Sequence, residues 1–147
     1  MRFDGKTVIV TGGALGIGRA VCELMAERGA AVSILDRDEK AAATICTEIE
    51  NAGGSAMFHS VDVSNFNEVQ IAVDATNAAF GSVNSLVVSA GIQRYGTAVS
   101  TDDAQWDEVL NINLRGAWHA AKAVIPLLKE SGGGTIVNVS SVQALAS

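Results

Sequence analysis

A glycine-rich turn, TGGALGIG at residues 11–18, has residue types and a spacing that could bind a phosphate group. Glycines have no Cβ, so the backbone amides of such a turn can approach a ligand closely. The helix predicted to follow would add its N-terminal dipole and unpaired N–H groups, which favour a negatively charged ligand. Because glycine-rich turns also occur for purely structural reasons, the turn alone is a weak signal for a pyrophosphate site.

A carboxylate at the end of the second predicted strand strengthens the interpretation as a dinucleotide site. Asp36 follows the glycines by about twenty residues, where a carboxylate can accept hydrogen bonds from a ribose 2′-hydroxyl. It would also repel the 2′-phosphate of NADP. The neighbouring Arg37 could reduce that repulsion, but the carboxylate still favours NAD. The alternative is that Asp36 caps a helix or is simply solvated.

Two serines, Ser140 and Ser141, follow the apolar run TIVNV near the end of the sequence. A serine placed at the end of a strand is usually one part of a site to which other segments contribute. His59 and His119 have no companions at metal-ligand spacing, so we expect polar side chains of a strand and a helix and no metal site.

Short apolar runs alternate with segments of helical periodicity along the whole chain. The runs predict strands at residues 7–10, 31–35, 56–61, 85–88 and 135–139. Helices are expected at residues 16–28 and 39–52, after a capping box formed by Asn65 and Glu68, and at residues 106–130. Strands with apolar centres, separated by helices, predict a parallel sheet covered on both faces. We therefore expect an α/β fold: a Rossmann-type, doubly wound parallel sheet in three α/β/α layers that ends after the fifth strand.

Apolar residues at helical spacing support the first two of these helices. In the first helix these residues are Ile17, Ala20, Val21 and Leu24. In the second helix they are Ala42, Ile45 and Ile49.

Composition and charge exclude several classes of protein. With 48% hydrophobic and 18% charged residues, the 147-residue chain has the profile of one globular domain. Its net charge of −6 gives no electrostatic support for binding nucleic acid or an anionic membrane. The N-terminus lacks the apolar core of a signal peptide, and no apolar run reaches the ~18 residues of a membrane span, so we expect a cytoplasmic protein. Cys22 and Cys46 are then expected to be buried, reduced thiols.

A series of motifs occurs along the chain in a family-specific order. It comprises TGxxxGxG (Thr11, Gly12, Gly16, Gly18), Asp62 with Val63 after the third strand, SAG at residues 89–91, N-L-x-G (Asn113, Leu114, Gly116) and IVNVSS at residues 136–141. With these motifs the sequence resembles the classical subtype of short-chain dehydrogenase/reductases over its entire length. The spacing of the glycines differs from the GxGxxG of other dinucleotide folds and is therefore quite specific.

The resemblance implies a cofactor site for NAD. Its residues would be Gly12, Leu15, Gly16, Ile17, Gly18, Asp36, Arg37, Asp62, Val63, Ser89, Ala90 and Gly91. In the family, the carboxylate at Asp62 meets the adenine amino group. Ser89 replaces the asparagine of the family's NAG, which reduces a sheet-stabilising amide to a hydroxyl.

The resemblance also implies part of a catalytic site. The family's asparagine, here Asn113, interrupts the long helix and holds a water molecule of a proton relay. Ser141 would hydrogen-bond the substrate oxygen, with Ser140 as the runner-up. In the family a tyrosine follows as the general acid/base, with a lysine one helical turn later. The 147 residues end before such a pair, and Tyr95 has no lysine four residues on.

These expectations describe an NAD-dependent oxidoreductase that interconverts an alcohol and a ketone or aldehyde. Residues 1–147 would be the NAD-binding Rossmann domain, the N-terminal part of a single family domain. The complete protein would be a homodimer or homotetramer, because the family's long helix lies in a dimer interface and here carries apolar residues on more than one face.

Two other functions remain to be weighed. The first is a non-catalytic dinucleotide-binding module or redox sensor that ends at Ser147. The second is an α/β methyltransferase, which also places an acid after its second strand. The methyltransferase is disfavoured because it leaves the Thr11–Gly12 start, Asn113 and Ser141 unexplained.

Overall fold

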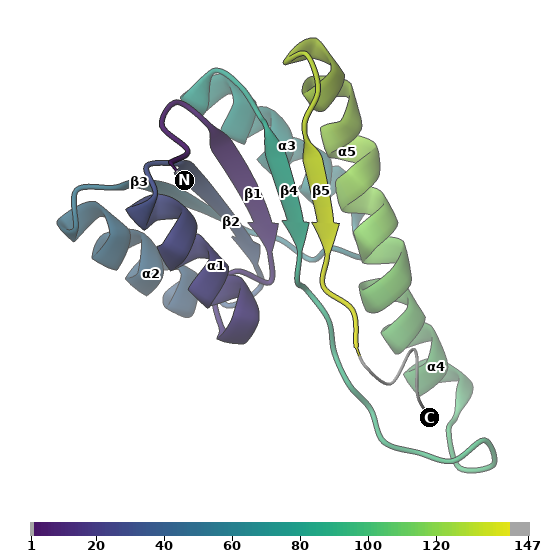
Figure 1. The fold of residues 1–147 in the computed structure, drawn as a ribbon. Helices are drawn as coiled ribbons and strands as arrows, with labels where there is room; N and C mark the ends of the chain where they lie inside the picture. Colours follow the sequence, from purple (N-terminus) through teal and green to yellow (C-terminus); the bar gives the residue numbers. More distant parts are fainter. Residues whose placement is uncertain (1, 142–147) are drawn as a thin grey trace.

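A five-stranded, parallel sheet forms the centre of the chain in the computed structural model, which describes residues 2–141. The strands are β1 (Thr7–Thr11), β2 (Ala31–Asp36), β3 (Ser55–Ser60), β4 (Ser85–Val88) and β5 (Thr135–Asn138). Their order across the sheet is β3-β2-β1-β4-β5 (Figure 1). The chain therefore moves outward from β1 to β3 and then returns to the other side of β1.

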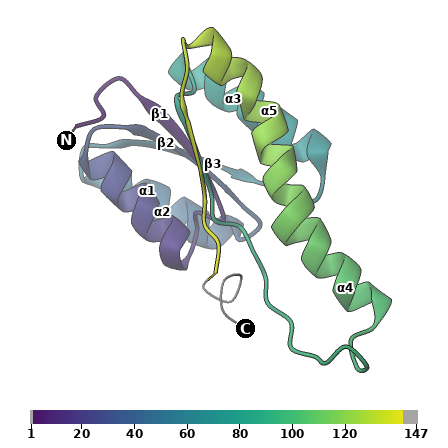
Figure 2. The same ribbon diagram turned by 45° about the vertical axis from the view of Figure 1, so that its right-hand side comes forward.

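Helices cover both faces of this sheet, which confirms the predicted three-layer α/β fold. They are α1 (Gly16–Glu27), α2 (Glu39–Asn51), α3 (Phe66–Phe80), α4 (Asp103–Leu110) and α5 (Gly116–Glu130). Figures 1 and 2 show α1 and α2 together on one face and α3 with α5 on the other. Val8 and Val10 of β1 belong to the core under α1 and α2, and Ile9 belongs to the core under α3 and α5. Among residues 2–141, no helix combines the length and the apolar character that a bilayer crossing requires.

Side-chain caps begin three of the helices and tie one of them to the sheet. Asp38, Asn65 and Asp102 each accept a hydrogen bond from a backbone N–H in the first turn of α2, α3 and α4, respectively. The predicted capping box at Asn65 is only partly correct. Glu68 accepts hydrogen bonds from the Asn65 side chain and the Asp62 N–H, because the Asn65 N–H already donates to the Asp62 carbonyl. Glu68 thereby connects α3 to the segment that follows β3.

Both helices form as predicted, but their apolar residues at helical spacing are largely exposed in α1 and buried in α2. Ile17 and Leu24 are 62% and 48% exposed, whereas Gly18 and Cys22 are buried. A Cβ at Gly18 would collide with the Gly12 carbonyl, so the helix packs on the loop through its small residues. Apolar spacing missed this face because it gives most weight to large side chains. In α2 the predicted residues are all buried: Ala42, Ile45 and Ile49.

The predicted long helix is continuous but changes its winding near the middle. It begins at Asp103 rather than at Trp106, because Asp102 caps it. Between α4 and α5, residues Asn111–Arg115 form a π-helical turn, η1. Such turns are frequent at functional sites, and Asn113 lies at the centre of this one. The helix interruption that the family resemblance implied is therefore present.

Candidate functional site

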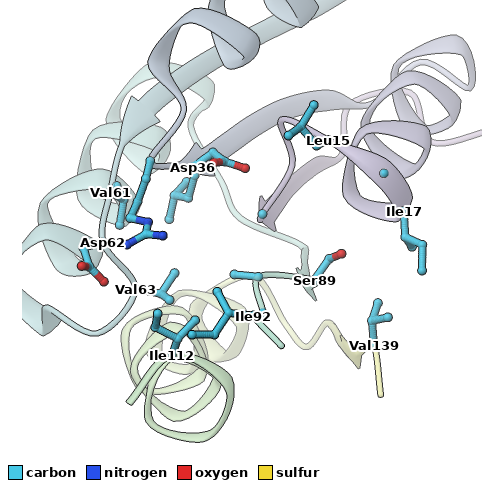
Figure 3. Close-up of a pocket in the computed structure, with 16 residues that line it drawn as sticks. Leu15, Ile17, Asp36, Val61, Asp62, Val63, Ser89, Ile92, Ile112 and Val139 are labelled. Carbon is cyan, nitrogen blue, oxygen red and sulfur yellow. The ribbon is translucent and has the colours of Figure 1, made fainter. Parts of the chain in front are cut away.

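A cavity of about 400 Å³ lies at the carboxyl ends of the strands, beside the reversal of strand order between β1 and β4. Open α/β sheets bind their ligands at this position. The lining includes every predicted cofactor residue except Gly18: Gly12, Leu15, Gly16, Ile17, Asp36, Arg37, Asp62, Val63, Ser89, Ala90 and Gly91 (Figure 3). We call this space the cofactor cavity. The structure brings the predicted residues together, and their contacts with a cofactor stay a prediction.

Two glycines explain the close approach of backbone segments around the cofactor cavity. Gly12 has a φ of +65°, and a Cβ there would lie 2.6 Å from the backbone N and Cα of Ala90. Gly18 lies outside the lining because it packs directly on Gly12. The two glycines thus let α1, the loop after β1 and the end of β4 share a space that side chains would fill.

Thr11 holds the ends of β1 and β4 together. Its side chain is fully buried, and its Oγ1 accepts hydrogen bonds from the N–H groups of Ser89 and Ala90, both at 3.3 Å. The Ser89 N–H also donates to the Thr11 carbonyl at 3.1 Å. Hydrogen bonds from its N–H groups to Thr11 therefore fix the SAG segment at this edge, although Ser89 replaces the asparagine of the family.

The N-terminus of α1 differs from those of α2, α3 and α4, which have a side-chain cap and an acidic residue in the first turn. Within the described chain, Leu15 at the N-cap of α1 makes no side-chain cap hydrogen bond, and the first turn of α1 contains no acidic residue. The cap position instead opens onto the cofactor cavity, as do Gly16 and Ile17. The first N–H groups and the positive end of the helix dipole suit a phosphate at this position.

Asp36 both shapes the glycine-rich turn and borders the cofactor cavity. Its Oδ2 accepts a hydrogen bond from the Ala14 N–H at 2.9 Å, and its Oδ1 accepts one from the Asp38 N–H at 3.0 Å. The cap of α2 is Asp38, so the helix-cap alternative for Asp36 is wrong. An ionised carboxylate has about four acceptor positions, which leaves room for ribose hydroxyls.

Asp62 carries a negative charge on the adjoining wall. Partial burial opposes its ionisation, but hydrogen bonds from the Ser64 side chain and N–H and the nearby Arg37 charge outweigh burial. Together they hold the pKa of the Asp62 carboxyl below its usual value. The carboxylate therefore stays ionised and able to accept a hydrogen bond from a ligand amine at neutral pH.

The residues around the cofactor cavity fit a dinucleotide. The uncapped start of α1 would supply N–H groups to a pyrophosphate, and Asp36 would supply acceptors to a ribose. Val63, Ile92 and Ile112 lie beside one another in Figure 3 and give an apolar wall that suits a planar base.

Sequence reasoning missed part of the lining of the cofactor cavity. The missed residues are Leu35, Val61, Ile92, Ile112 and Val139. Leu35 and Val61 precede the two acids at strand ends, so a rule that includes the last apolar residue of each strand could have found them. Ile112 had no such signal, because the π-helical turn that directs it to the cavity is a tertiary feature.

A second cavity, of about 670 Å³, adjoins the first and shares Ala90 and Val139 with it. It lies between the end of β5 and the α5 side of the molecule, and we call it the catalytic cavity. Asn113, Ser140 and Ser141 all line it. The structure therefore brings together the predicted catalytic residues, while the choice between the two serines stays a prediction.

Asn113 joins the π-helical turn to the loop after β4. Its Oδ1 accepts a hydrogen bond from the Ile92 N–H at 2.8 Å, and its Nδ2 donates to the Ile92 carbonyl at 2.9 Å. The side-chain amide thus pairs with both backbone polar groups of one residue, Ile92. The role of Asn113 in holding a relay water stays a prediction.

The loop after Ile92 contributes Tyr95 to a different region. Tyr95 is 85% exposed and lines a small cavity of about 180 Å³ together with Trp106. Arg94 makes two hydrogen bonds to the Glu108 carboxylate, at 2.7 and 2.9 Å, and so ties this loop to α4. Tyr95 lines neither the cofactor cavity nor the catalytic cavity.

The two histidines and the two cysteines line neither the cofactor cavity nor the catalytic cavity. No metal-binding cluster of His, Cys, Asp or Glu occurs among the described residues. Burial raises the pKa of the Cys22 thiol to about 12 and that of Cys46 to about 11, so both thiols are protonated and buried as expected. Burial lowers the pKa of His59, and His119 is a buried residue of α5.

Comparisons with known proteins agree with this geometry. The family model described as short chain dehydrogenase matches residues 6–147. Cyclopentanol dehydrogenase of a Comamonas species is 38% identical over 98% of this chain and 58% of its own length. D-threitol dehydrogenase of Mycolicibacterium smegmatis is 37% identical over 97% of this chain and 55% of its own length.

Solved structures show the same similarity in three dimensions. A 7α-hydroxysteroid dehydrogenase complexed with NADH and 7-oxo glycochenodeoxycholic acid matches with a TM-score of 0.95 and 29% identity, over 99% of this chain and 57% of that one. A short-chain type dehydrogenase/reductase from Mycobacterium ulcerans matches with a TM-score of 0.93 and 30% identity, over 98% of this chain and 54% of that one. The chain thus spans little more than half the length of the relatives it matches.

Proposed function

This chain belongs to the short-chain dehydrogenase family, and we propose that residues 1–147 form the NAD-binding, N-terminal part of a single domain of an oxidoreductase. The complete protein would interconvert an alcohol and a ketone or aldehyde. The family uses a nicotinamide dinucleotide, and the specific choice of NAD belongs to this proposal.

Asp36 on the wall of the cofactor cavity is the observation that carries the choice of NAD. A carboxylate there accepts hydrogen bonds from ribose hydroxyls and repels a 2′-phosphate. Its two hydrogen bonds to backbone N–H groups hold it in place before a ligand arrives. Titration calorimetry with NAD and NADP tests the proposal, and equal or reversed affinities would exclude this role of Asp36.

When bound, the nicotinamide ring would supply the hydride chemistry. Ser141 would orient the substrate oxygen in the catalytic cavity, and Asn113 would hold the adjoining loop and a relay water. Neither residue can replace the phenol that serves the family as general acid/base. A Tyr-x-x-x-Lys sequence after Ser147 in the complete reading frame would support the enzyme. Its absence would favour the alternative of a non-catalytic dinucleotide-binding module or redox sensor.

The substrate in this proposal is a small-molecule alcohol or carbonyl compound. Related proteins are named as dehydrogenases of cyclopentanol, D-threitol and a hydroxysteroid, which share a secondary alcohol. The mixed lining of the catalytic cavity, with Asn113 and two serines beside Leu114 and Trp118, suits such a substrate.

The proposal also includes the oligomeric state and the cellular location of the complete protein. Exposed apolar side chains follow one another along the long helix: Trp106, Leu110, Leu114, Trp118 and Ile125. They support a homodimer or homotetramer of the complete protein. Sedimentation that shows a monomer at micromolar concentration would contradict it. A cytoplasmic location, and no nucleic-acid or membrane partner, stay predictions from composition.

A further inference from the structure

The segment after β3 forms one wall of the cofactor cavity, and α5 holds this segment from behind. Asp62 and Val63 both line the cavity. His119 of α5 is 6% exposed, and its Nδ1–H donates a hydrogen bond of 2.9 Å to the Val63 carbonyl. The contact joins residues that are 56 positions apart in the sequence.

Gly116 gives the same wall a second contact with α5. A Cβ at Gly116 would lie 2.6 Å from Val63 Cγ2 and 3.0 Å from Val63 Cβ. The Val63 side chain therefore rests directly on the helix backbone. With its carbonyl bound to His119 and its side chain against Gly116, Val63 has its position set from two directions.

A third contact fixes the far end of this segment. Phe66 begins α3, and the Nζ of Lys122 lies 4.2 Å from the centroid of its ring. The His119 ring lies 5.5 Å from the same ring and 5.1 Å from that of Trp118. His119 is thus enclosed by aromatic rings and directed at Val63.

We infer that His119 is a positioning residue for the adenine end of the cofactor site, an inference that rests on the proposed binding of NAD. Asn113 and Ser141 line the neighbouring catalytic cavity, so the reacting end of the cofactor belongs on that side. Asp62 and Val63 are then left for the opposite, adenine end. Without the imidazole N–H, the Val63 carbonyl would lose its partner, and the segment would shift to find another.

The test measures dissociation constants for NAD and for AMP by calorimetry on the product of the complete reading frame. His119→Leu removes the donor at similar volume, and His119→Asn places an amide near the position of Nδ1. We expect His119→Leu to raise both dissociation constants about tenfold and His119→Asn to stay within about threefold of the parent, as for other groups that orient a ligand site. Turnover at saturating NAD should change less than about twofold for either variant, because the reacting end is untouched.

Two further variants separate positioning from stability. Leu128→Ala removes a buried side chain of the same helix that lines neither cavity, so it should lower the melting temperature and leave NAD affinity unchanged. Gly116→Ala keeps every hydrogen bond but pushes Val63, so it should weaken NAD and AMP binding several-fold. If His119→Leu does not fold, the NAD and AMP dissociation constants of Gly116→Ala test the inference in its place.

Several results would overturn the inference. One is unchanged NAD affinity in both His119→Leu and Gly116→Ala. Another is an equal loss of affinity in His119→Leu and Leu128→Ala, which would reduce the role of His119 to stability. A parent protein that binds AMP but not NAD, or neither, would instead overturn the proposed function and this inference with it.

Discussion

The cofactor cavity and the catalytic cavity share two residues but are built from different parts of the sheet. The first is lined mainly by the segments that follow β1, β2, β3 and β4, and its polar groups are held by hydrogen bonds from backbone N–H groups, as at Thr11 and Asp36. The second depends on β5, whose Val137 is 48% exposed and which pairs only with β4 among the described strands. Under the proposed function, cofactor binding would therefore depend on segments within residues 2–141, whereas catalysis would also depend on what covers the edge at β5.

The largest expected effect is the loss of catalytic activity in a polypeptide that has the cofactor cavity but lacks the general acid/base. A polypeptide of residues 1–147 alone should show no measurable NAD-linked oxidation of cyclopentanol. These residues contain no tyrosine with a lysine four positions later, and a general acid/base contributes about 10² to 10⁴ in rate. Poor solubility of this polypeptide is expected as well, because the bare edge of β5 favours association.

Tyr95 offers the matching control in the complete protein. Because it is largely exposed and lies outside both cavities, Tyr95→Phe should leave turnover within about twofold of the parent. Activity of the 147-residue polypeptide that Tyr95→Phe abolishes would assign the proton transfer to Tyr95 instead.

The two serines of the catalytic cavity give the next largest effect. In the complete protein, Ser141→Ala should lower kcat about 10²-fold, the usual cost of losing one donor to a developing oxyanion, with no change in NAD affinity. Ser140→Ala should change kcat only a few-fold. Steady-state kinetics and calorimetry on both variants decide the assignment, and the reverse pattern would assign the role to Ser140.

Substitution of Asp36 tests the cofactor cavity and leaves the catalytic cavity unchanged. The parent should bind NAD at least about tenfold more tightly than NADP, which corresponds to about 1.4 kcal/mol. Asp36→Ala should remove that preference and also weaken NAD, because the Ala14 N–H loses its acceptor and the glycine-rich turn loosens. Unaltered selectivity in calorimetric titrations of the variant would exclude Asp36 as the selecting residue.

The smallest effect concerns the pH dependence of stability. The pKa of the Asp62 carboxyl lies below its usual value in the folded chain, so its contribution is present above the unfolded-state pKa and is lost as the pH falls through the folded value. The free energy of unfolding should therefore decrease below about pH 4. Asp62→Asn should lessen this decrease by less than about 1 kcal/mol. Urea denaturation at neutral pH and at low pH measures it, and an identical acid dependence in both proteins would contradict the role of Asp62.

The sequence by itself determined the fold class and most of the cofactor cavity. Alternating strand and helix patterns predicted the sheet because β1 and its neighbours are covered on both faces and carry continuous apolar runs. The glycine-rich turn and Asp36 were recognisable because a phosphate site and a ribose site each depend on one short segment at a strand end.

Only the tertiary structure decided which residues far apart in the sequence come into contact. Ile17 and Leu24 proved exposed because Gly18 brings α1 onto the glycine-rich turn through its small face. Ile112 reaches the cofactor cavity through a π-helical turn that periodicity does not reveal. His119, an ordinary polar residue in the sequence, meets the Val63 carbonyl only because α5 packs against the segment after β3. Such contacts depend on how elements pack, and a local pattern of residue types does not specify which distant segment an element meets.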